Sequence, residues 1–267
     1  QSAGITSHTS CEVLAFLVRS GYVMYFDREM LRHIVILNPQ WLFSVMACLL
    51  SHSTHSGTSD GVLPLETTSE LLVGYSKQEH MSLVMLLNKF ELLFFFTLNG
   101  RRMVVVPASL PELPPPAFHE WLRLPQSDLI EYRRVHLFPF IPLAFFSRLL
   151  VRLLNIANLA CTNMWRTGVE LRFLGQTAMI NLSSHEQTLF TRVRVRPSVR
   201  TDPQSSLLIL LLETIETLIN SYYTKLSVRR LVPCDHCIRT GDSSKAFMFP
   251  VEDLMKAVAR DSTLIVY

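Results

Sequence analysis

The chain has 267 residues, of which 49% are hydrophobic and 18% are charged, and its formal net charge is +3. This length suffices for one large or two ordinary domains, and the small charge gives no indication of nucleic acid by itself. No apolar run approaches the roughly 18–20 residues of a membrane-spanning helix, so we expect part of the apolar surplus to lie against a partner or another domain.

The most informative segment of the N-terminal half is a strand that runs directly into a helix at 34–50. Ile34 to Leu37 are β-prone, Asn38 is a good N-cap, and Pro39 suits the first helical position because its missing N–H costs nothing there. Apolar residues then recur at helical spacing from Leu42. We expect Trp41, which lies off that stripe, to pack between this helix and a neighbouring element.

The other elements of this half are predicted by turn and capping signals. Ser76 and Glu79 form a capping box that opens a helix to Phe90, and Asn99–Gly100 is a strong hairpin signal between strands at 91–98 and 101–107. A helix over 11–19, a short strand over 22–26, an extended segment at 61–63 and a short helix at 67–73 complete this half. Helices followed by a hairpin predict a winged-helix-like subdomain.

A proline-rich stretch separates the two halves. Pro107, Pro111 and Pro114 to Pro116 cannot continue a helix or a central strand, and Leu124–Pro125 extends the interruption. We therefore place the domain boundary between residues 124 and 125, which gives domains over 1–124 and 125–267.

The second half predicts an antiparallel sheet with helices packed on it. Strands are expected at 131–138, 165–173, 177–182, 189–196, 231–234 and 246–249, and helices at 142–156, 206–226 and 252–260. Arg192, Arg194 and Arg196 alternate with Val193 and Val195, which is typical of a half-buried strand. The fold class that follows is α+β.

Cysteine usage leaves one open question. The five cysteines are an odd number, and three lie in apolar or helical context, as free thiols of a cytosolic protein do. Cys234 and Cys237 form a Cys-x-x-Cys pair that could supply two thiolates to zinc. However, the thirty residues that follow hold no Cys or His. Reduced loop cysteines are the alternative that we favour, with a metal-dependent module as a remoter function.

Nucleic-acid binding is the alternative function that the winged-helix order suggests. Its recognition helix would be 77–90, which is largely apolar, whereas a helix that reads a groove needs a basic and polar face. For the arginine strip of Arg192, Arg194, Arg196 and Arg200 we favour the solvated face of a half-buried strand. Docking to an acidic partner surface, or discouragement of edge-to-edge strand pairing, is the alternative.

The search for enzyme motifs finds none. The sequence lacks Gly-x4-Gly-Lys, Gly-x-Ser-x-Gly and His-Glu-x-x-His, and nine glycines in the whole chain disfavour a nucleotide-cradling backbone. We therefore predict no catalytic residue, no cofactor site and no metal site. The N-terminal Gln1 to Ser10 is small and polar, so no signal peptide is expected.

Several blocks in order resemble one known family. Leu37 to Leu42, Leu-Asn-Pro-Gln-Trp-Leu, resembles the "LxPQWL" signature of the COR domain of Roco proteins, the animal leucine-rich-repeat kinases in particular. The remaining blocks that resemble the family are Tyr22–Asp27, Leu87–Glu91, Val104–Pro111, Pro139–Leu149, Met164–Val169, Val232–Cys237 and 249–253.

The resemblance implies an accessory domain. In Roco proteins the COR domain follows a Ras-like GTPase domain (Roc), packs against it, and dimerises through its C-terminal half, COR-B. GTP or GDP and Mg would then be bound by the Roc domain alone. Nucleotide state is relayed to the dimer and, in the kinases, to a downstream kinase domain. The two halves of this chain would be COR-A and COR-B.

Two sets of residues follow as candidates for those contacts. A family Tyr that faces the GTPase is replaced by His136, and Ala144 and Phe146 stand where the kinases have Gly and Trp. The aromatic side chains beside prolines suggest a GTPase-facing segment, for which ordinary COR-B core is the alternative. Its candidates are His136, Phe138, Phe140, Phe145 and Arg148. For the homodimer we can name only Arg192, Arg194, Arg196 and the long helix after them.

Overall fold

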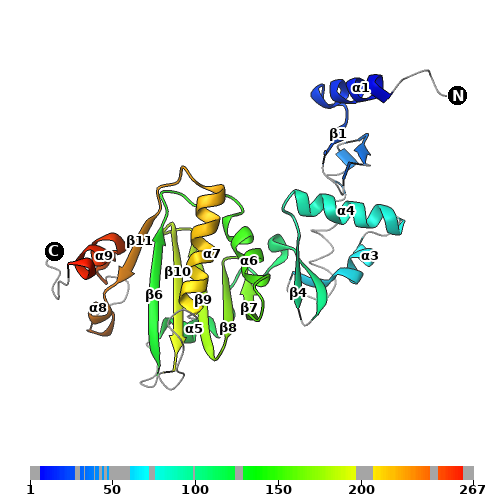
Figure 1. Cartoon of the computed structure of the whole chain (residues 1–267). Helices are drawn as coiled ribbons and strands as arrows, with labels where there is room; N and C mark the ends of the chain where they lie inside the picture. Colours follow the sequence, from blue (N-terminus) through cyan, green and yellow to red (C-terminus); the bar gives the residue numbers. More distant parts are fainter. Residues whose placement is uncertain are drawn as a thin grey trace. The chain divides into compact units, whose positions relative to one another are not determined.

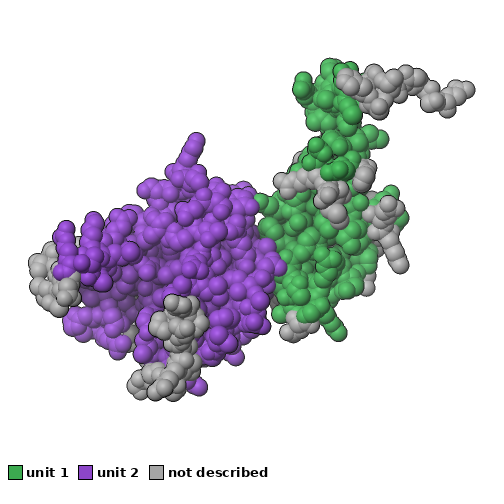
Figure 2. Space-filling view, viewed as in Figure 1, with its two compact units in different colours: residues 1–110 green, residues 111–267 purple. Residues whose placement is uncertain are grey.

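A computed structural model describes most of the chain, in which two compact units divide between Leu110 and Pro111 (Figure 2). The described residues are 7–27, 31–32, 34–38, 40–41, 44, 47, 61–71, 76–98, 100–123, 129–196, 207–240 and 246–260. Helices and antiparallel sheets make up both units, so the predicted α+β class is confirmed. No helix within these ranges is long and apolar enough to cross a membrane.

Unit 1 is built around one helix and a three-stranded sheet of order β3-β5-β4 (Figure 1). Its elements are α1 (Ser7–Arg19), β1 (Met24–Tyr25), β2 (Val35–Ile36), β3 (Val62–Pro64), the 3₁₀ turn η1 (Leu65–Thr67), α3 (Thr68–Leu71), α4 (Lys77–Lys89), β4 (Phe94–Leu98), β5 (Arg101–Val105) and η2 (Pro107–Ser109). Leu83, Val84 and Leu87 of α4 pack against Leu93 and Val104. The predicted helix-then-hairpin order is present.

The local signals of unit 1 are satisfied as the sequence predicts. The Ser76 side chain accepts a hydrogen bond from the Glu79 N–H, and the Glu79 carboxylate accepts one from the Ser76 N–H, which completes the capping box. The Asn38 Oδ1 accepts from the Gln40 N–H at 3.0 Å, so Asn38 caps the following helix. Trp41 packs against both core clusters of the unit, as expected of a residue between elements. The stripe residues from Leu42 to Leu50 lie outside the described residues.

Unit 2 is a seven-stranded antiparallel sheet of order β12-β11-β6-β10-β9-β8-β7 with helices on both faces. In Figure 1, α7 lies along one face of the sheet, nearly parallel to the strands, and α5 lies behind the other. The elements are α5 (Phe118–Leu122), β6 (Ile130–Leu137), α6 (Phe145–Leu154), β7 (Ala160–Trp165), β8 (Gly168–Phe173), β9 (Gln176–Ser183), β10 (Thr188–Val195), α7 (Leu207–Tyr222), β11 (Arg229–Pro233), α8 (Asp235–Thr240), β12 (Met248–Pro250) and α9 (Val251–Ala259).

Three elements of unit 2 are absent from the sequence prediction: helix α5, strand β7 and helix α8. Strand β7 precedes a tight turn, and Trp165 pairs with Gly168 across it; the prediction placed Trp165 at the start of a strand instead of at the end of one. A Cβ at Gly168 would lie 1.9 Å from the Trp165 ring, so only glycine fits there. Helix α8 has six residues, and its single turn is too short for a periodic pattern.

The division between the units precedes the boundary predicted at 124/125. Residues 111–123 belong to unit 2 because they carry α5. Trp121 of this helix is buried against Trp165 and Met179 of the sheet, and Phe118 joins the same cluster. The prolines therefore lie at the beginning of unit 2, and composition alone could not show which side α5 would join.

Candidate interaction surface

The segment 138–144 forms a corner between β6 and α6 that is held by one residue of the β9–β10 turn. The Phe138 N–H donates to the Gln187 backbone O at 2.9 Å, and the Ile141 N–H donates to Gln187 Oε1 at 2.7 Å. Ala144, at the N-cap of α6, has φ 61°, which is the left-handed region. The family glycine at this position is explained by that conformation, because glycine has no Cβ to clash there.

Aromatic rings connect this corner to the end of α7. The centroids of Phe138 and Phe145 are 4.9 Å apart, and those of Phe145 and Tyr223 are 5.6 Å apart. Phe138 and Phe145 are buried, as is Phe146. These rings are therefore core residues that fix the corner against α7. For Phe138 and Phe145, two of the five GTPase-facing candidates, this agrees with the alternative of ordinary core residues.

The outer surface of the corner carries exposed apolar side chains and half-buried arginines, which we call the corner patch: Phe140, Leu143, Arg148, Arg152 and Tyr222. Leu143 is 97% exposed, Phe140 60% and Tyr222 56%. The guanidinium carbons of Arg148 and Arg152 lie 4.8 and 5.3 Å from the Tyr222 ring centroid. Arg148 Nη1 also donates to the Tyr223 hydroxyl at 3.0 Å. Exposed aliphatic and aromatic side chains beside ordered arginines are the composition of interface anchors.

His136 lies inside the sheet, in what we call the α7-face cluster: His136, Glu216 and Arg230. Its Nε2 is 3.3 Å from Glu216 Oε1, and Arg230 Nε and Nη2 donate to the two Glu216 oxygens, each at 2.6 Å. The hydrogen bond with His136, then those from Arg230, lower the pKa of Glu216 to about 2 against the opposing effect of burial. His136 is 1% exposed, so it cannot reach a partner surface itself.

Arg192 and Arg194 lie on the opposite face, in what we call the α5-face cluster: Glu131, Arg133, Arg192 and Arg194. Arg194 Nε and Arg133 Nε donate to the two oxygens of Glu131, whose side chain is 2% exposed. Burial lowers the pKa of Arg192, and the charges of Arg133 and Arg194 lower it further, while Glu131 opposes them.

The same arginines hold α5 on the sheet. Arg192 Nη1 donates to the Trp121 backbone O at 2.5 Å, and Arg194 Nη2 donates to the backbone O of Arg123 at 2.9 Å. The Arg194 guanidinium also lies 4.4 Å from the Trp121 ring centroid. Cations at the last carbonyls of a helix complement its dipole. Among the predicted dimer candidates Arg192 and Arg194 therefore serve an internal contact, and Arg196 alone is exposed.

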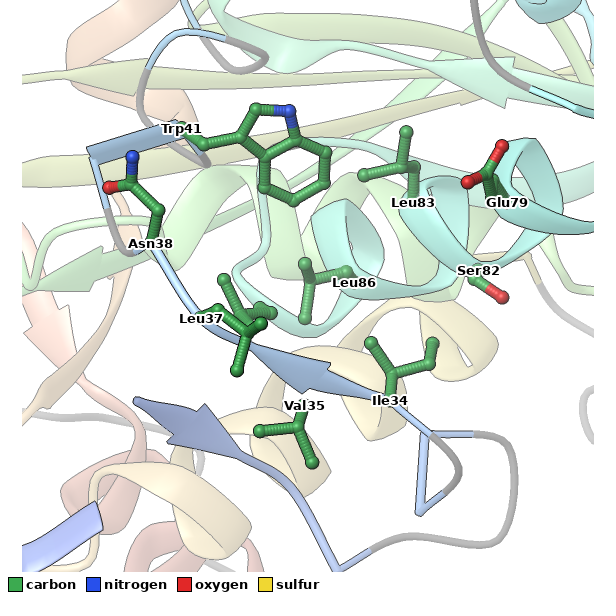
Figure 3. Close-up of a pocket in the computed structure, with 10 residues that line it drawn as sticks. Ile34, Val35, Leu37, Asn38, Trp41, Glu79, Ser82, Leu83 and Leu86 are labelled. Atoms are coloured by element: carbon green, nitrogen blue, oxygen red, sulfur yellow. The ribbon is translucent and has the colours of Figure 1, made fainter. Parts of the chain in front are cut away.

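A cavity lies in each unit among the residues that the structure describes. A groove of about 690 Å³ lies on the α5 side of the sheet of unit 2, and its lining includes Trp121, Arg133, Phe190, Arg192 and Ile238. In unit 1, a pocket of about 410 Å³ lies between the segment 34–38 and α4. Figure 3 shows Trp41, Leu83 and Leu86 around it. Leu37, Asn38 and Trp41 of the family-like segment thus line a mainly apolar pocket, beside which Leu37 is exposed.

The structure also shows where the remaining predicted sites lie, namely the candidate DNA-reading helix and the cysteine pair. Leu83, Val84, Leu86 and Leu87 of α4 are buried, so the helix that would read a DNA groove is largely a core helix. Cys234 and Cys237 are free thiols at the beginning of α8. Within the described ranges no three His, Cys, Asp or Glu side chains gather as a metal site would require.

The sequence prediction missed residues that the structure brings together. Tyr222, Arg152 and Leu143 complete the corner patch, and Glu216 is the partner of His136. The spacing of Arg148 and Arg152, one turn apart on a predicted helix, was a usable signal. The contacts of Tyr222 and Glu216 depend on the folding of α7 beside α6 and β6.

Two family models match the chain. The model described as "C-terminal of Roc, COR-A domain" matches residues 1–110, and the model described as "C-terminal of Roc, COR-B domain" matches residues 130–267. These ranges coincide with unit 1 and most of unit 2.

Curated relatives come from Dictyostelium discoideum. The probable serine/threonine-protein kinase pats1 is 28% identical over 244 residues, which are 89% of this chain and 7% of that protein. The probable serine/threonine-protein kinase roco11 is 33% identical over 171 residues, 60% of this chain and 11% of that protein. Cyclic GMP-binding protein C is 22% identical over 94% of this chain and 10% of its own length. The chain thus spans about a tenth or less of these relatives, and a particular closeness to the animal kinases stays a prediction.

Proposed function

The chain belongs to the C-terminal-of-Roc (COR) family of Roco proteins, and from this membership we propose that it packs on a Roc GTPase domain through the corner patch. COR domains are accessory to the Roc GTPase. The proposed contact lies in the segment for which the family resemblance implies a GTPase-facing role.

The observation that carries this proposal is the exposure of Leu143 on a rigid support. Leu143 is almost fully exposed, while the corner that bears it is fixed by Gln187 and by the buried Phe138–Phe145 pair. Because the backbone of the corner is already fixed, binding there orders little additional backbone, so Leu143 is a favourable anchor. Arg148 and Arg152, held against Tyr222, would frame this anchor with positive charge.

His136 has a positioning role in this proposal. It lies two residues before Phe138, where the corner begins, and Glu216 ties it to α7. It therefore joins the strand that leads into the corner to the helix that bears Tyr222. A direct contact between His136 and the GTPase is not part of the proposal.

Dimerisation and relay rest on family membership. We propose that unit 2, the COR-B half, forms the homodimer and that the nucleotide state of the Roc domain changes how the corner patch is engaged. In the kinases of the family, a kinase domain would receive this change. Cytoplasmic location fits such a signalling protein. The GTP or GDP and Mg of this system would be held by the Roc domain.

The docking proposal is tested by titrating this chain with a Roc domain that carries GDP or a non-hydrolysable GTP analogue, using isothermal titration calorimetry. The variant Leu143→Asp should weaken binding at least about tenfold, because interface anchors commonly carry 2 kcal/mol or more. Leu174→Asp is the matched control, since Leu174 is also exposed but lies in the β8–β9 turn. Equal affinity of the two variants for the Roc domain would contradict the proposal.

The dimer proposal needs a separate measurement. Sedimentation velocity of the chain, alone and with the Roc domain, should show a dimer in at least one nucleotide state. Monomers under all of these conditions would contradict dimerisation and leave the docking result intact.

A further inference from the structure

Cys234 and Cys237 lie within a single closed turn at the junction of β11 and α8. The Ile238 N–H donates to the Cys234 backbone O at 3.1 Å, so the helical hydrogen-bond pattern begins at Cys234. Cα atoms three residues apart in such a turn are about 5 Å apart. Disulfides join residues whose Cα atoms are about 4.4–6.8 Å apart. The two thiols can therefore be joined with little change in the backbone.

The junction is anchored on both sides. The Cys234 N–H donates to the Phe247 backbone O at 2.7 Å, and the neighbouring Pro233 pairs with Met248 of β12. Ile238, which follows Cys237, is buried. Both cysteines are half-buried and free, so small reagents in solution can approach them from the open side.

The chain contains a contrasting thiol that serves as an internal reference. Hydrogen bonds from the Cys237 backbone N–H, the Cys237 thiol and the His236 backbone N–H lower the pKa of Cys234, although desolvation and the carboxylate of Asp235 oppose them. Burial raises the pKa of Cys161 in β7 to about 12, and the charge of Glu170 adds to that effect. Because the thiolate is the reactive form, we expect Cys234 to react faster than Cys161.

We propose that Cys234 and Cys237 form a redox-responsive dithiol, which a low-molecular-weight disulfide of the glutathione class oxidises to an intramolecular disulfide. The Cys234 thiolate attacks one sulfur of the small disulfide and forms a mixed disulfide, while the first small thiolate leaves. Cys237 then loses its proton to solvent and attacks the Cys234 sulfur, and the second small thiolate leaves. Two protein thiols and one small disulfide thus give one protein disulfide and two small thiols.

The experiment uses the full chain in buffers of defined reduced-to-oxidised glutathione ratio. Acid quenching, alkylation and peptide mass spectrometry then report each cysteine. As oxidised glutathione increases, the peptide with Cys234 and Cys237 should lose both alkylation sites together, while Cys161 keeps its thiol. In native buffer at pH 7 without glutathione, Cys234 should be alkylated at least about a hundredfold faster than Cys161.

Two serine variants separate the steps. Cys237→Ser should stop at the mixed disulfide and accumulate a glutathione adduct on Cys234, whereas Cys234→Ser should yield no disulfide within this peptide. The proposal is overturned if Cys234 and Cys237 remain fully alkylatable at every ratio, or if Cys237→Ser forms no adduct. These readouts do not involve a Roc domain, so they are independent of the docking proposal.

Discussion

The two faces of the sheet in unit 2 each use charged residues to hold a helix, but they divide the charges differently. In the α7-face cluster the helix supplies the carboxylate of Glu216, and the strands supply His136 and Arg230. In the α5-face cluster the strands supply both Glu131 and the arginines, and α5 contributes only backbone carbonyls and the Trp121 ring.

The length of the two helices explains this difference. Helix α7 has 16 residues and buries Leu207, Leu211, Ile215, Leu218 and Ile219, so apolar packing stabilises it. Helix α5 has five residues and buries only Trp121, and a helix this short is not stable without tertiary contacts. The arginines of β10 supply such contacts. A strip of like charges on an alternating strand can therefore be an internal support for a short element.

The largest expected effect comes from removing the carboxylate of the α5-face cluster. Glu131→Gln leaves Arg133 and Arg194 without their compensating charge in a buried place, so the free energy of unfolding should fall by about 3–5 kcal/mol. Urea unfolding followed by tryptophan fluorescence measures this loss, because Trp121 lies against Arg194 of the cluster and Trp165 packs with Trp121.

The matched control is Glu112→Gln, which removes the carboxylate of an ion pair with Arg166 in which both side chains are largely exposed. Exposed pairs contribute about 0–1 kcal/mol. If Glu131→Gln costs no more than this control, the α5-face cluster does not stabilise the fold, and the comparison between the two faces fails.

The α7-face cluster should have a smaller and pH-dependent effect. The folded-state pKa of Glu216 is about 2, below its ordinary value of 4.5, so its contribution is present above that ordinary value. The contribution is lost as the pH falls from about 4.5 toward 2. At pH 7, Glu216→Gln should cost about 2 kcal/mol, allowing for the partial exposure of this carboxylate.

Unfolding measurements at pH 7, 5 and 3 test this expectation for Glu216→Gln. The difference between the variant and the original chain should shrink at the lowest pH. Glu213→Gln is the control on the same helix, because Glu213 is exposed. A difference that stays constant across the three pH values would show that ionisation of Glu216 contributes nothing to stability.

The features that the sequence predicts well are the local ones. The Ser76–Glu79 capping box, the Asn38 cap and the hairpin at Gly100 each depend on residues within four positions. Strands and helices of at least eight residues, such as β6, β10 and α7, also follow from their periodicity.

The features that the sequence cannot predict depend on distant residues. Arg194 contacts Arg123, 71 residues away, and His136 contacts Glu216, 80 residues away. Neither partner is visible from the strand pattern, so an internal arginine and an exposed one look alike in the sequence. The same reason explains why Phe138 and Phe145 resemble interface aromatics before the end of α7 is in place.

The smallest expected effect comes from backbone strain at Ala144, which lies outside the charge clusters on the two faces of the sheet. Ala144 begins α6 at φ 61°, where an L side chain costs roughly 1–2 kcal/mol. Ala144→Gly removes that cost but gives the unfolded chain about 0.4–1 kcal/mol more conformational entropy. The net result should be a gain of about 0.5–1 kcal/mol in urea unfolding. Ala257→Gly within α9 makes the same substitution where the backbone is helical, so it should lose roughly 0.5–1 kcal/mol. Changes of opposite sign in the free energy of unfolding of the two variants would show that strain at Ala144 affects stability independently of the charge clusters. Changes of the same sign would contradict this.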